Sequence, residues 1–166
     1  MVSTPTGACA DTVPGSDLAG LEETRHGCAG RLRQAVEAIE EAVRIRRGLG
    51  LQADLAMSLG TITLTYRAVA ESTEDEQERA LWLGKALDSI EEALVYFRES
   101  GVVQYWAQAV RDSVISHLML AQRTGELDVE RVLALCREGE ALCGPMQDVE
   151  GLAFYQQVRR ALEGQD

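Results

Sequence analysis

Apolar residues recur at intervals of three and four positions along most of this chain. Residues 32–43 show the pattern clearly, because six of them fall on one side of an ideal helix and most of the others are charged. The six are Leu32, Ala35, Val36, Ile39, Ala42 and Val43. Alternation with a period of two, which is typical of strands, extends nowhere beyond a few residues. The pattern therefore predicts an all-α protein.

Turn residues divide the apolar pattern into successive helices. We expect helices over residues 32–47, 52–71, 74–99, 102–122, 128–142 and 145–162. Gly48, Gly101 and Gly125 should end three of them, because glycine readily adopts the left-handed conformation found after a helix. Gly144 and Pro145 are interpreted as the end of one helix and the start of the next. The second helix should bury its apolar seam, which consists of Leu55, Leu59, Ile62, Tyr66, Val69 and Ala70.

Two further boundaries depend on weaker signals. Thr73 and Glu76 match a capping box, in which Thr73 would cap the third helix and Glu76 would reach back to it. Residues 17–26 could form a short separate helix, although two glycines in and after this segment weaken it. Residues 1–16 combine proline and glycine with serine and threonine, which predicts a flexible tail. The helical domain would then occupy residues 17–166.

The helical pattern repeats at an interval of 51 residues. The segment from Ala35 to Ala56 matches the segment from Ala86 to Ala107 without a gap. The identical positions include Ala35, Ile39, Glu40, Glu41 and Ala42 in the first copy and Ala86, Ile90, Glu91, Glu92 and Ala93 in the second. A fixed period of this size indicates stacked helical repeats, because each unit buries its apolar face only against its neighbours. Ile39 and Ile90 should therefore occupy equivalent buried positions.

The repeated positions resemble those of tetratricopeptide repeats. The second helix of that family's unit carries a small residue, a large apolar residue four positions later and an alanine three positions after that, as at Ala35, Ile39 and Ala42. A degenerate third copy follows at Ala134, Glu138 and Ala141, and Leu59 and Gly60 match the first helix of a unit. The units here run 51 and then 48 residues, against about 34 in the family. Units of this length resemble the repeats found beside caspase-like peptidase domains and in bacterial signalling ATPases.

The resemblance implies a short right-handed α–α superhelix of about three antiparallel helix pairs. It also implies that the first helix of each pair lines a concave groove. The positions assigned to the groove lie on two of the expected helices and are Asp54, Met57, Thr61, Leu64, Tyr105, Gln108, Asp112 and Ile115. Methionine and tyrosine among polar side chains suit peptide binding. Some of these side chains could instead face a neighbouring helix or solvent.

The charge of the chain narrows the class of partner. The formal net charge is −11, whereas nucleic acids and anionic membranes are bound by basic surfaces. An acidic protein attracts a basic or amphipathic partner instead. No segment has the pattern of a signal peptide or of a membrane span, so we expect a cytoplasmic protein.

Candidate chemistry is sparse. The four cysteines (Cys9, Cys28, Cys136, Cys143) have neither metal-ligand nor redox spacing, and no glycine-rich phosphate loop is present. His117 lies 51 residues after Tyr66, which favours a repeat-core position over catalysis, while a cysteine–histidine pair formed in space stays open. The recurring glutamate pairs indicate architecture and solvation rather than general acids. We therefore expect no cofactor, no metal and no enzymatic activity.

Non-catalytic binding of a protein or peptide is the function that these features favour, as a scaffold or adaptor. One alternative is a small tetratricopeptide-type chaperone for an unstable client. Another is a regulatory subunit of a separately encoded enzyme or protease. The identity of the partner and the oligomeric state stay open at this point.

Overall fold

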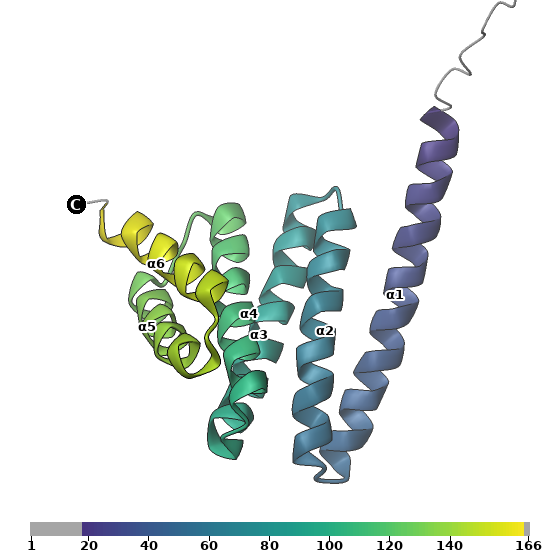
Figure 1. The fold of residues 1–166 in the computed structure, drawn as a ribbon. Helices are drawn as coiled ribbons and strands as arrows, with labels where there is room; N and C mark the ends of the chain where they lie inside the picture. The colour runs from purple at the N-terminus through teal and green to yellow at the C-terminus, as the bar shows by residue number, and fades with distance from the viewer. Residues whose placement is uncertain (1–17, 165–166) are drawn as a thin grey trace, which may run out of the picture.

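The computed structural model describes residues 18–164, and these residues form six α-helices and no strand (Figure 1). The helices are α1 (Leu18–Gly48), α2 (Gln52–Ser72), α3 (Glu76–Ser100), α4 (Val103–Thr124), α5 (Val129–Met146) and α6 (Val149–Glu163). The prediction of an all-α protein is confirmed. The expected N-terminal tail, residues 1–16, lies outside the described residues.

Each helix packs mainly against its neighbours in the sequence. The packed pairs are α1–α2, α2–α3, α3–α4, α4–α5 and α5–α6, and Figure 1 shows the helices following one another across the molecule. Short turns join them, and a short turn forces consecutive helices to run antiparallel side by side. The fold is therefore a linear series of helical hairpins.

The hydrophobic core extends along this series. The larger cluster takes buried residues from every helix in the described part of the chain, from Val43 in α1 to Tyr155 in α6. A smaller cluster lies between the first three helices and consists of Val36, Ile62, Tyr66, Val69 and Ala86. The predicted seam of α2 is buried at every position, from Leu55 to Ala70. Burial of these apolar side chains supplies most of the driving force for packing.

The repeat-equivalent isoleucines differ in burial. Ile90 in α3 is 1% exposed, whereas Ile39 in α1 is partly buried and packs against both clusters. The reason is their position in the series, because α3 packs against both α2 and α4 whereas α1 packs mainly against α2 in the described structure. The prediction is confirmed for Ile90 and holds only in part for Ile39.

The short separate helix expected at residues 17–26 is wrong. Residues 18–48 form one continuous helix of 31 residues, α1, which runs through the glycines of this segment. A glycine inside a helix costs about 1 kcal/mol relative to alanine but does not by itself turn the chain. Gly101 and Gly125 do end helices, because both adopt the left-handed conformation, with φ angles of 68° and 73°.

The capping box at Thr73 is also wrong. Asp75 is the N-cap of α3, and its side chain accepts a hydrogen bond from the Glu78 backbone N–H at 2.7 Å. Thr73 follows the end of α2 instead, where its hydroxyl donates to the Val69 carbonyl at 2.8 Å and its side chain is buried. The helix begins two residues later than the box predicts because the aspartate provides the stronger acceptor.

Gly144 and Pro145 do not separate the last two helices. Both lie in the final turn of α5, which ends at Met146, and Gln147 then adopts a left-handed conformation with φ 56°. Asp148 caps α6 by accepting from the Gly151 N–H at 2.8 Å. A proline this close to the C-terminus interrupts little of the hydrogen-bond ladder, so the turn forms after it.

Candidate binding face and the charged layer

The four predicted groove positions on α2 form one exposed stripe. Asp54, Met57, Thr61 and Leu64 follow one another at intervals of three and four residues, so they lie on the same side of the helix. Met57 is 43% exposed and Leu64 is 49% exposed, although the opposite side of α2 is buried in both core clusters. The stripe is an accessible surface with two large apolar side chains.

The four predicted positions on α4 divide into two groups. Tyr105 is 47% exposed and Gln108 is exposed, whereas Ile115 is half-buried and Asp112 is buried. The Tyr105 ring packs beside Phe97 of α3, with ring centroids 5.6 Å apart. We use the name α2–α4 face for the exposed members, which are Asp54, Met57, Thr61, Leu64, Tyr105 and Gln108.

Asp112 is a buried structural residue and is not part of the exposed surface. One carboxylate oxygen accepts from Arg67 Nη1 at 3.1 Å, and the other accepts from Gln108 Nε2 at 2.9 Å. The Asp112 and Arg67 side chains are only 7% and 15% exposed, so the pair is largely removed from water. The Arg67–Asp112 pair joins α2 to α4. Asp54 is therefore the predicted carboxylate that remains exposed there.

Opposite charges at a constant spacing join alternate helices. The four pairs are Arg33–Glu78, Glu40–Lys85, Arg47–Glu92 and Arg67–Asp112, and in each the partners are 45 residues apart. The first three join α1 to α3 and the fourth joins α2 to α4. Exposed ion pairs stabilise little individually, at about 0–1 kcal/mol, but a regular series favours one alignment of the helices. These charges are present in the sequence, but the apolar repeat does not reveal which of them pair.

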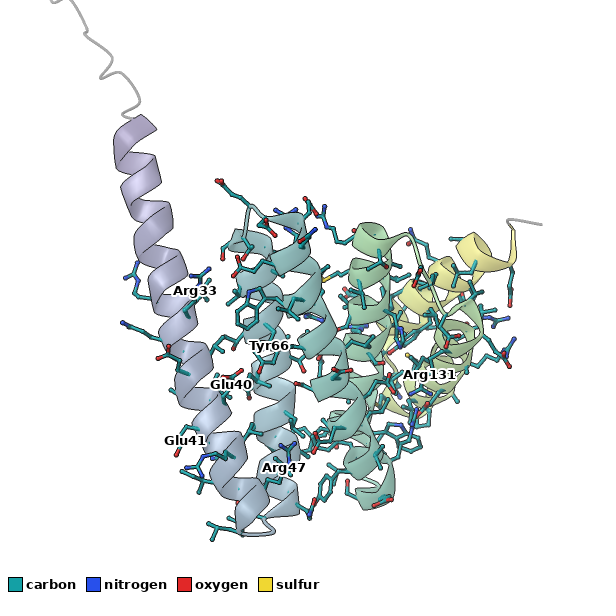
Figure 2. All side chains as sticks on the ribbon, turned by 180° about the vertical axis from the view of Figure 1, so that it is seen from behind. Arg33, Glu40, Glu41, Arg47, Tyr66 and Arg131 are labelled. Carbon is teal, nitrogen blue, oxygen red and sulfur yellow. The ribbon has the colours of Figure 1, made fainter. Side chains whose placement is uncertain are left out.

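Between α3 and α5 the corresponding spacing is 40 residues. Arg98 pairs with Glu138 at 2.6 Å, and Arg131 pairs with Glu91. We call these ion pairs between alternate helices the charged layer, and Figure 2 labels four of its members, Arg33, Glu40, Arg47 and Arg131. Glu91 also accepts from Ser113, and His117 Nε2 lies 3.5 Å from its carboxylate. His117 is thus half-buried beside a structural carboxylate, in agreement with the expected repeat-core position.

The same arrangement recurs one repeat earlier. Tyr66 lies 51 residues before His117, and its hydroxyl donates to Glu40 at 2.7 Å. Glu40 in turn lies 51 residues before Glu91. Burial and the hydrogen bond to Glu40 both raise the pKa of Tyr66. The recurring glutamates are therefore architectural, as expected, but Glu91 is only 29% exposed and is less solvated than the sequence suggested.

Burial and hydrogen bonding act in opposite directions on Glu91. Burial alone would raise the pKa of this carboxyl group, but its three polar neighbours favour the charged form and lower the pKa to about 2. Glu91 therefore remains ionised at any physiological pH. A permanently charged carboxylate that is fully engaged by its own chain is poorly suited to proton transfer.

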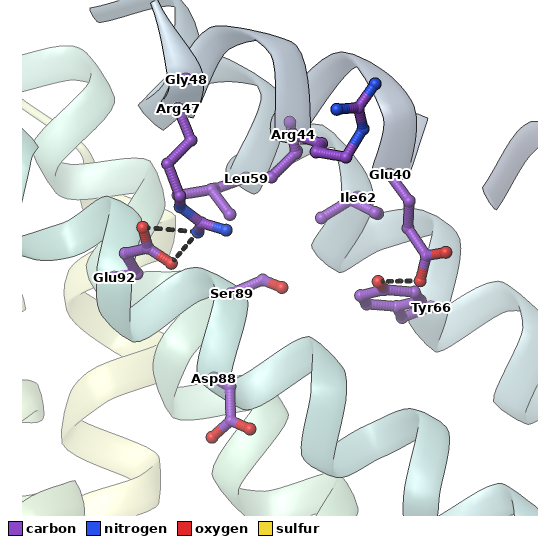
Figure 3. A pocket seen from close by; sticks show the side chains of 11 residues that line it. Glu40, Arg44, Arg47, Gly48, Leu59, Ile62, Tyr66, Asp88, Ser89 and Glu92 are labelled. Atoms are coloured by element: carbon purple, nitrogen blue, oxygen red, sulfur yellow. Dashed lines mark hydrogen bonds and ion pairs between the residues drawn. The ribbon is translucent and has the colours of Figure 1, made fainter. Parts of the chain in front are cut away.

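A pocket of about 630 Å³ opens between α1, α2 and α3 (Figure 3). Its lining combines an apolar floor with charged walls and includes Val43, Leu59, Ile62, Arg44, Asp88 and Ser89. The Arg47–Glu92 pair lies at one end and the Glu40–Tyr66 hydrogen bond at the other. None of the predicted groove positions lines this pocket.

The cysteines that the structure describes are buried in the core. Burial raises the pKa of Cys136 to about 11, so its thiol stays protonated near neutral pH, and Cys143 is also buried and free. Among residues 30–164, whose side chains the structure describes, no three histidine, cysteine, aspartate or glutamate side chains are grouped as metal ligands. No helix in that range combines the length and hydropathy that crossing a membrane requires. Cys9 and the Cys28 side chain lie outside what the structure describes.

Comparisons of this chain with protein-family models, with curated proteins and with solved structures find no match. Its function is therefore inferred from its own residues and their geometry.

Proposed function

We propose that this protein binds a peptide or a segment of another protein through the α2–α4 face, without catalysing a reaction. The observation that supports the proposal is the exposure of Met57, Leu64 and Tyr105 on helices whose opposite sides are buried. Single exposed apolar residues are common on proteins, but three large ones on two helices that the Arg67–Asp112 ion pair joins form a surface that a partner can cover.

The side chains of this face suit a short apolar anchor flanked by polar groups. Tyrosine and methionine provide most of the contact area at low polarity, and tyrosine is frequent among residues that dominate binding energy. Asp54, Thr61 and Gln108 supply hydrogen-bonding groups beside them. With a net charge of −11, the protein attracts a basic or amphipathic segment.

The proposal includes an assignment of the helices to tetratricopeptide-type units. In this assignment α2–α3 and α4–α5 are two pairs of a right-handed stack, and the α2–α4 face is its concave side. The 51-residue repeat and the regular bridges between alternate helices support it. The role of a scaffold or adaptor follows from such a stack by analogy.

A peptide library tests this function directly. The purified protein is incubated with an immobilised library of peptides, and the enriched peptides are titrated by fluorescence anisotropy. We expect enrichment of lysine, arginine and large apolar residues. Tyr105→Ala should weaken binding at least about tenfold, or roughly 1.4 kcal/mol, as expected when a central aromatic anchor is lost. Asp54→Asn should mainly reduce the dependence of binding on salt.

Two variants control this experiment. Tyr105→Phe keeps the ring and should retain most of the affinity, and Val95→Ala changes a residue of α3 that is 53% exposed but outside the face. Unchanged affinity for a folded Tyr105→Ala variant would exclude the α2–α4 face. Binding only to unfolded proteins would favour the chaperone alternative, and binding only to a folded enzyme would favour the regulatory subunit.

A further inference from the structure

The pocket between α1, α2 and α3 is not used by the proposed peptide binding. None of the residues that line it belongs to the α2–α4 face. Its volume of about 630 Å³ lies within the range of small-molecule sites, which is about 300–1,000 Å³. The pocket exists because α1 and α3 both pack against α2 but make few contacts with each other. The space between these two helices is therefore available to a ligand.

The floor of this pocket is apolar. Leu59, Ile62 and Tyr66 of α2 line it together with Val43 of α1, and all four belong to the hydrophobic core. Covering such a surface with an apolar group removes both from water, which lowers the free energy. A ligand that fits the floor should therefore have an apolar body.

Two sets of charged side chains bridge the helices on either side of the open space. At one end Arg47 pairs with Glu92 at 2.7 Å. At the other end Glu40 accepts a hydrogen bond from Tyr66 at 2.7 Å and lies 3.6 Å from Lys85 Nζ. These groups are engaged by their own chain, so they define the ends of the pocket rather than its specificity.

Arg44 and Asp88 are the two charged lining residues that remain between these bridges. Both side chains are exposed, and Figure 3 shows them on opposite sides of the pocket, on α1 and α3. Unlike Lys85 and Glu92 on the same helix, the Asp88 carboxylate forms no hydrogen bond or ion pair within residues 30–164. Arg44 pairs with Glu41, one turn earlier on α1. An exposed ion pair between neighbours on one helix is weak, so a ligand carboxylate can replace Glu41.

We propose that this pocket binds a small zwitterion with an apolar body, which is either a free apolar amino acid or a dipeptide of such residues. The carboxylate of the ligand pairs with Arg44, its ammonium group pairs with Asp88, and its apolar side chains cover Leu59 and Ile62. A zwitterion fits best because opposite charges stand on opposite walls, and a singly charged ligand would leave one of them unmatched. The site is independent of the α2–α4 face, so it holds whether or not that face binds a peptide.

Titration of the purified full-length protein with leucine and with leucyl-leucine tests the proposal. Two-dimensional amide NMR measures the affinity, and the shifted amides should cluster around the pocket. The ligand that binds more tightly identifies the source as a free amino acid or a dipeptide. Its N-acetylated and its amidated derivatives each lack one charge and should bind at least about fivefold more weakly. Its glycine analogue lacks the apolar body and should bind at least about tenfold more weakly.

Four variants assign the contacts. Asp88→Asn and Arg44→Gln change exposed side chains, so each should weaken binding at least about fivefold while the helical circular dichroism stays unchanged. Glu41→Gln removes the competitor for Arg44 and should not weaken binding. Asp54→Asn changes the exposed carboxylate of the α2–α4 face and is the matched control, with no effect expected.

Three results would overturn the proposal. The first is the absence of saturable binding of both ligands at millimolar concentrations. The second is equal affinity for the zwitterion and its N-acetylated derivative, or unchanged affinity of a folded Asp88→Asn variant. The third is a set of shifted amides on the α2–α4 face, together with weaker binding by Asp54→Asn, which would assign the ligand to that face instead.

Discussion

Glu91 shows how a single residue acquires its role from three helices. It belongs to α3, and its carboxylate is surrounded by Ser113 and His117 of α4 and by Arg131 of α5. Glu92, the next residue along the chain, is exposed and pairs with Arg47 at 2.7 Å. Two adjacent glutamates therefore have different environments, because successive helical positions point about 100° apart.

Glu91 should make the stability of the protein sensitive to acid. Its pKa is about 2 in the folded protein and near 4.5 when unfolded. The unfolded chain thus binds a proton first, and the stabilisation is complete above about pH 4.5 and is lost as the pH falls towards 2. Glu91→Gln should lower the free energy of unfolding by about 1–3 kcal/mol at neutral pH and reduce the loss of stability in acid. Urea unfolding at a series of pH values measures both effects.

Glu92→Gln provides the matched control for this prediction. Its exposed ion pair should contribute no more than about 1 kcal/mol, with little change in the acid profile. If Glu91→Gln and the wild type lose stability equally between about pH 5 and about pH 3, Glu91 is not the group responsible.

At the scale of the helices, glycines have different consequences according to what packs against them. Gly84 lies inside α3, and apart from the neighbouring backbone of its own helix no atom lies within 4 Å of the place where a Cβ would be. Gly139 lies inside α5, where an added Cβ would overlap the ring of Tyr155. That ring is 2% exposed and cannot move aside into solvent. The first glycine is thus replaceable, whereas the second makes room for α6.

Alanine substitutions should therefore act in opposite directions at these two sites. Gly84→Ala should raise the free energy of unfolding by about 0.5–1 kcal/mol, because alanine is the better helix former and meets no obstacle. Gly139→Ala should lower it by about 1–3 kcal/mol, because the methyl group forces α5 and α6 apart. Chemical unfolding of both variants measures the difference. Changes of the same sign would show that the contact between Gly139 and Tyr155 is not restrictive.

For the whole molecule, the linear order of the helices predicts uneven stability. The helix α3 has α2 on one side and α4 on the other, and it buries six side chains, including Leu83, Ile90 and Leu94. The helix α6 packs against α5 and buries only Gly151 and Tyr155 completely. A helix with fewer buried contacts opens locally at a lower free energy.

Hydrogen–deuterium exchange with mass spectrometry should reveal this gradient. We expect the slowest exchange in α3 and faster exchange in α6, by at least about tenfold, since each factor of ten corresponds to about 1.4 kcal/mol of opening free energy. Equal protection of α3 and α6 would indicate that the series opens as one cooperative unit.

Several features of the protein follow from the sequence by itself. The all-α fold and the buried seam of α2 follow from apolar spacing, and the ends at Gly101 and Gly125 follow from the conformational freedom of glycine. The 51-residue repeat predicted the burial of Ile90. These signals are local or periodic, so they can be read from the sequence without knowing which helices pack together.

Other features were decided only by the tertiary structure. Asp112 belongs to the same helical stripe as Tyr105 and Gln108, yet it is buried because Arg67, 45 residues earlier, approaches it from α2. Ile39 and Ile90 occupy equivalent positions but differ in burial because only one has helices on both sides. Periodicity determines which residues share a face, whereas the neighbours in space determine whether that face is covered, and the free energy of burial depends on that cover.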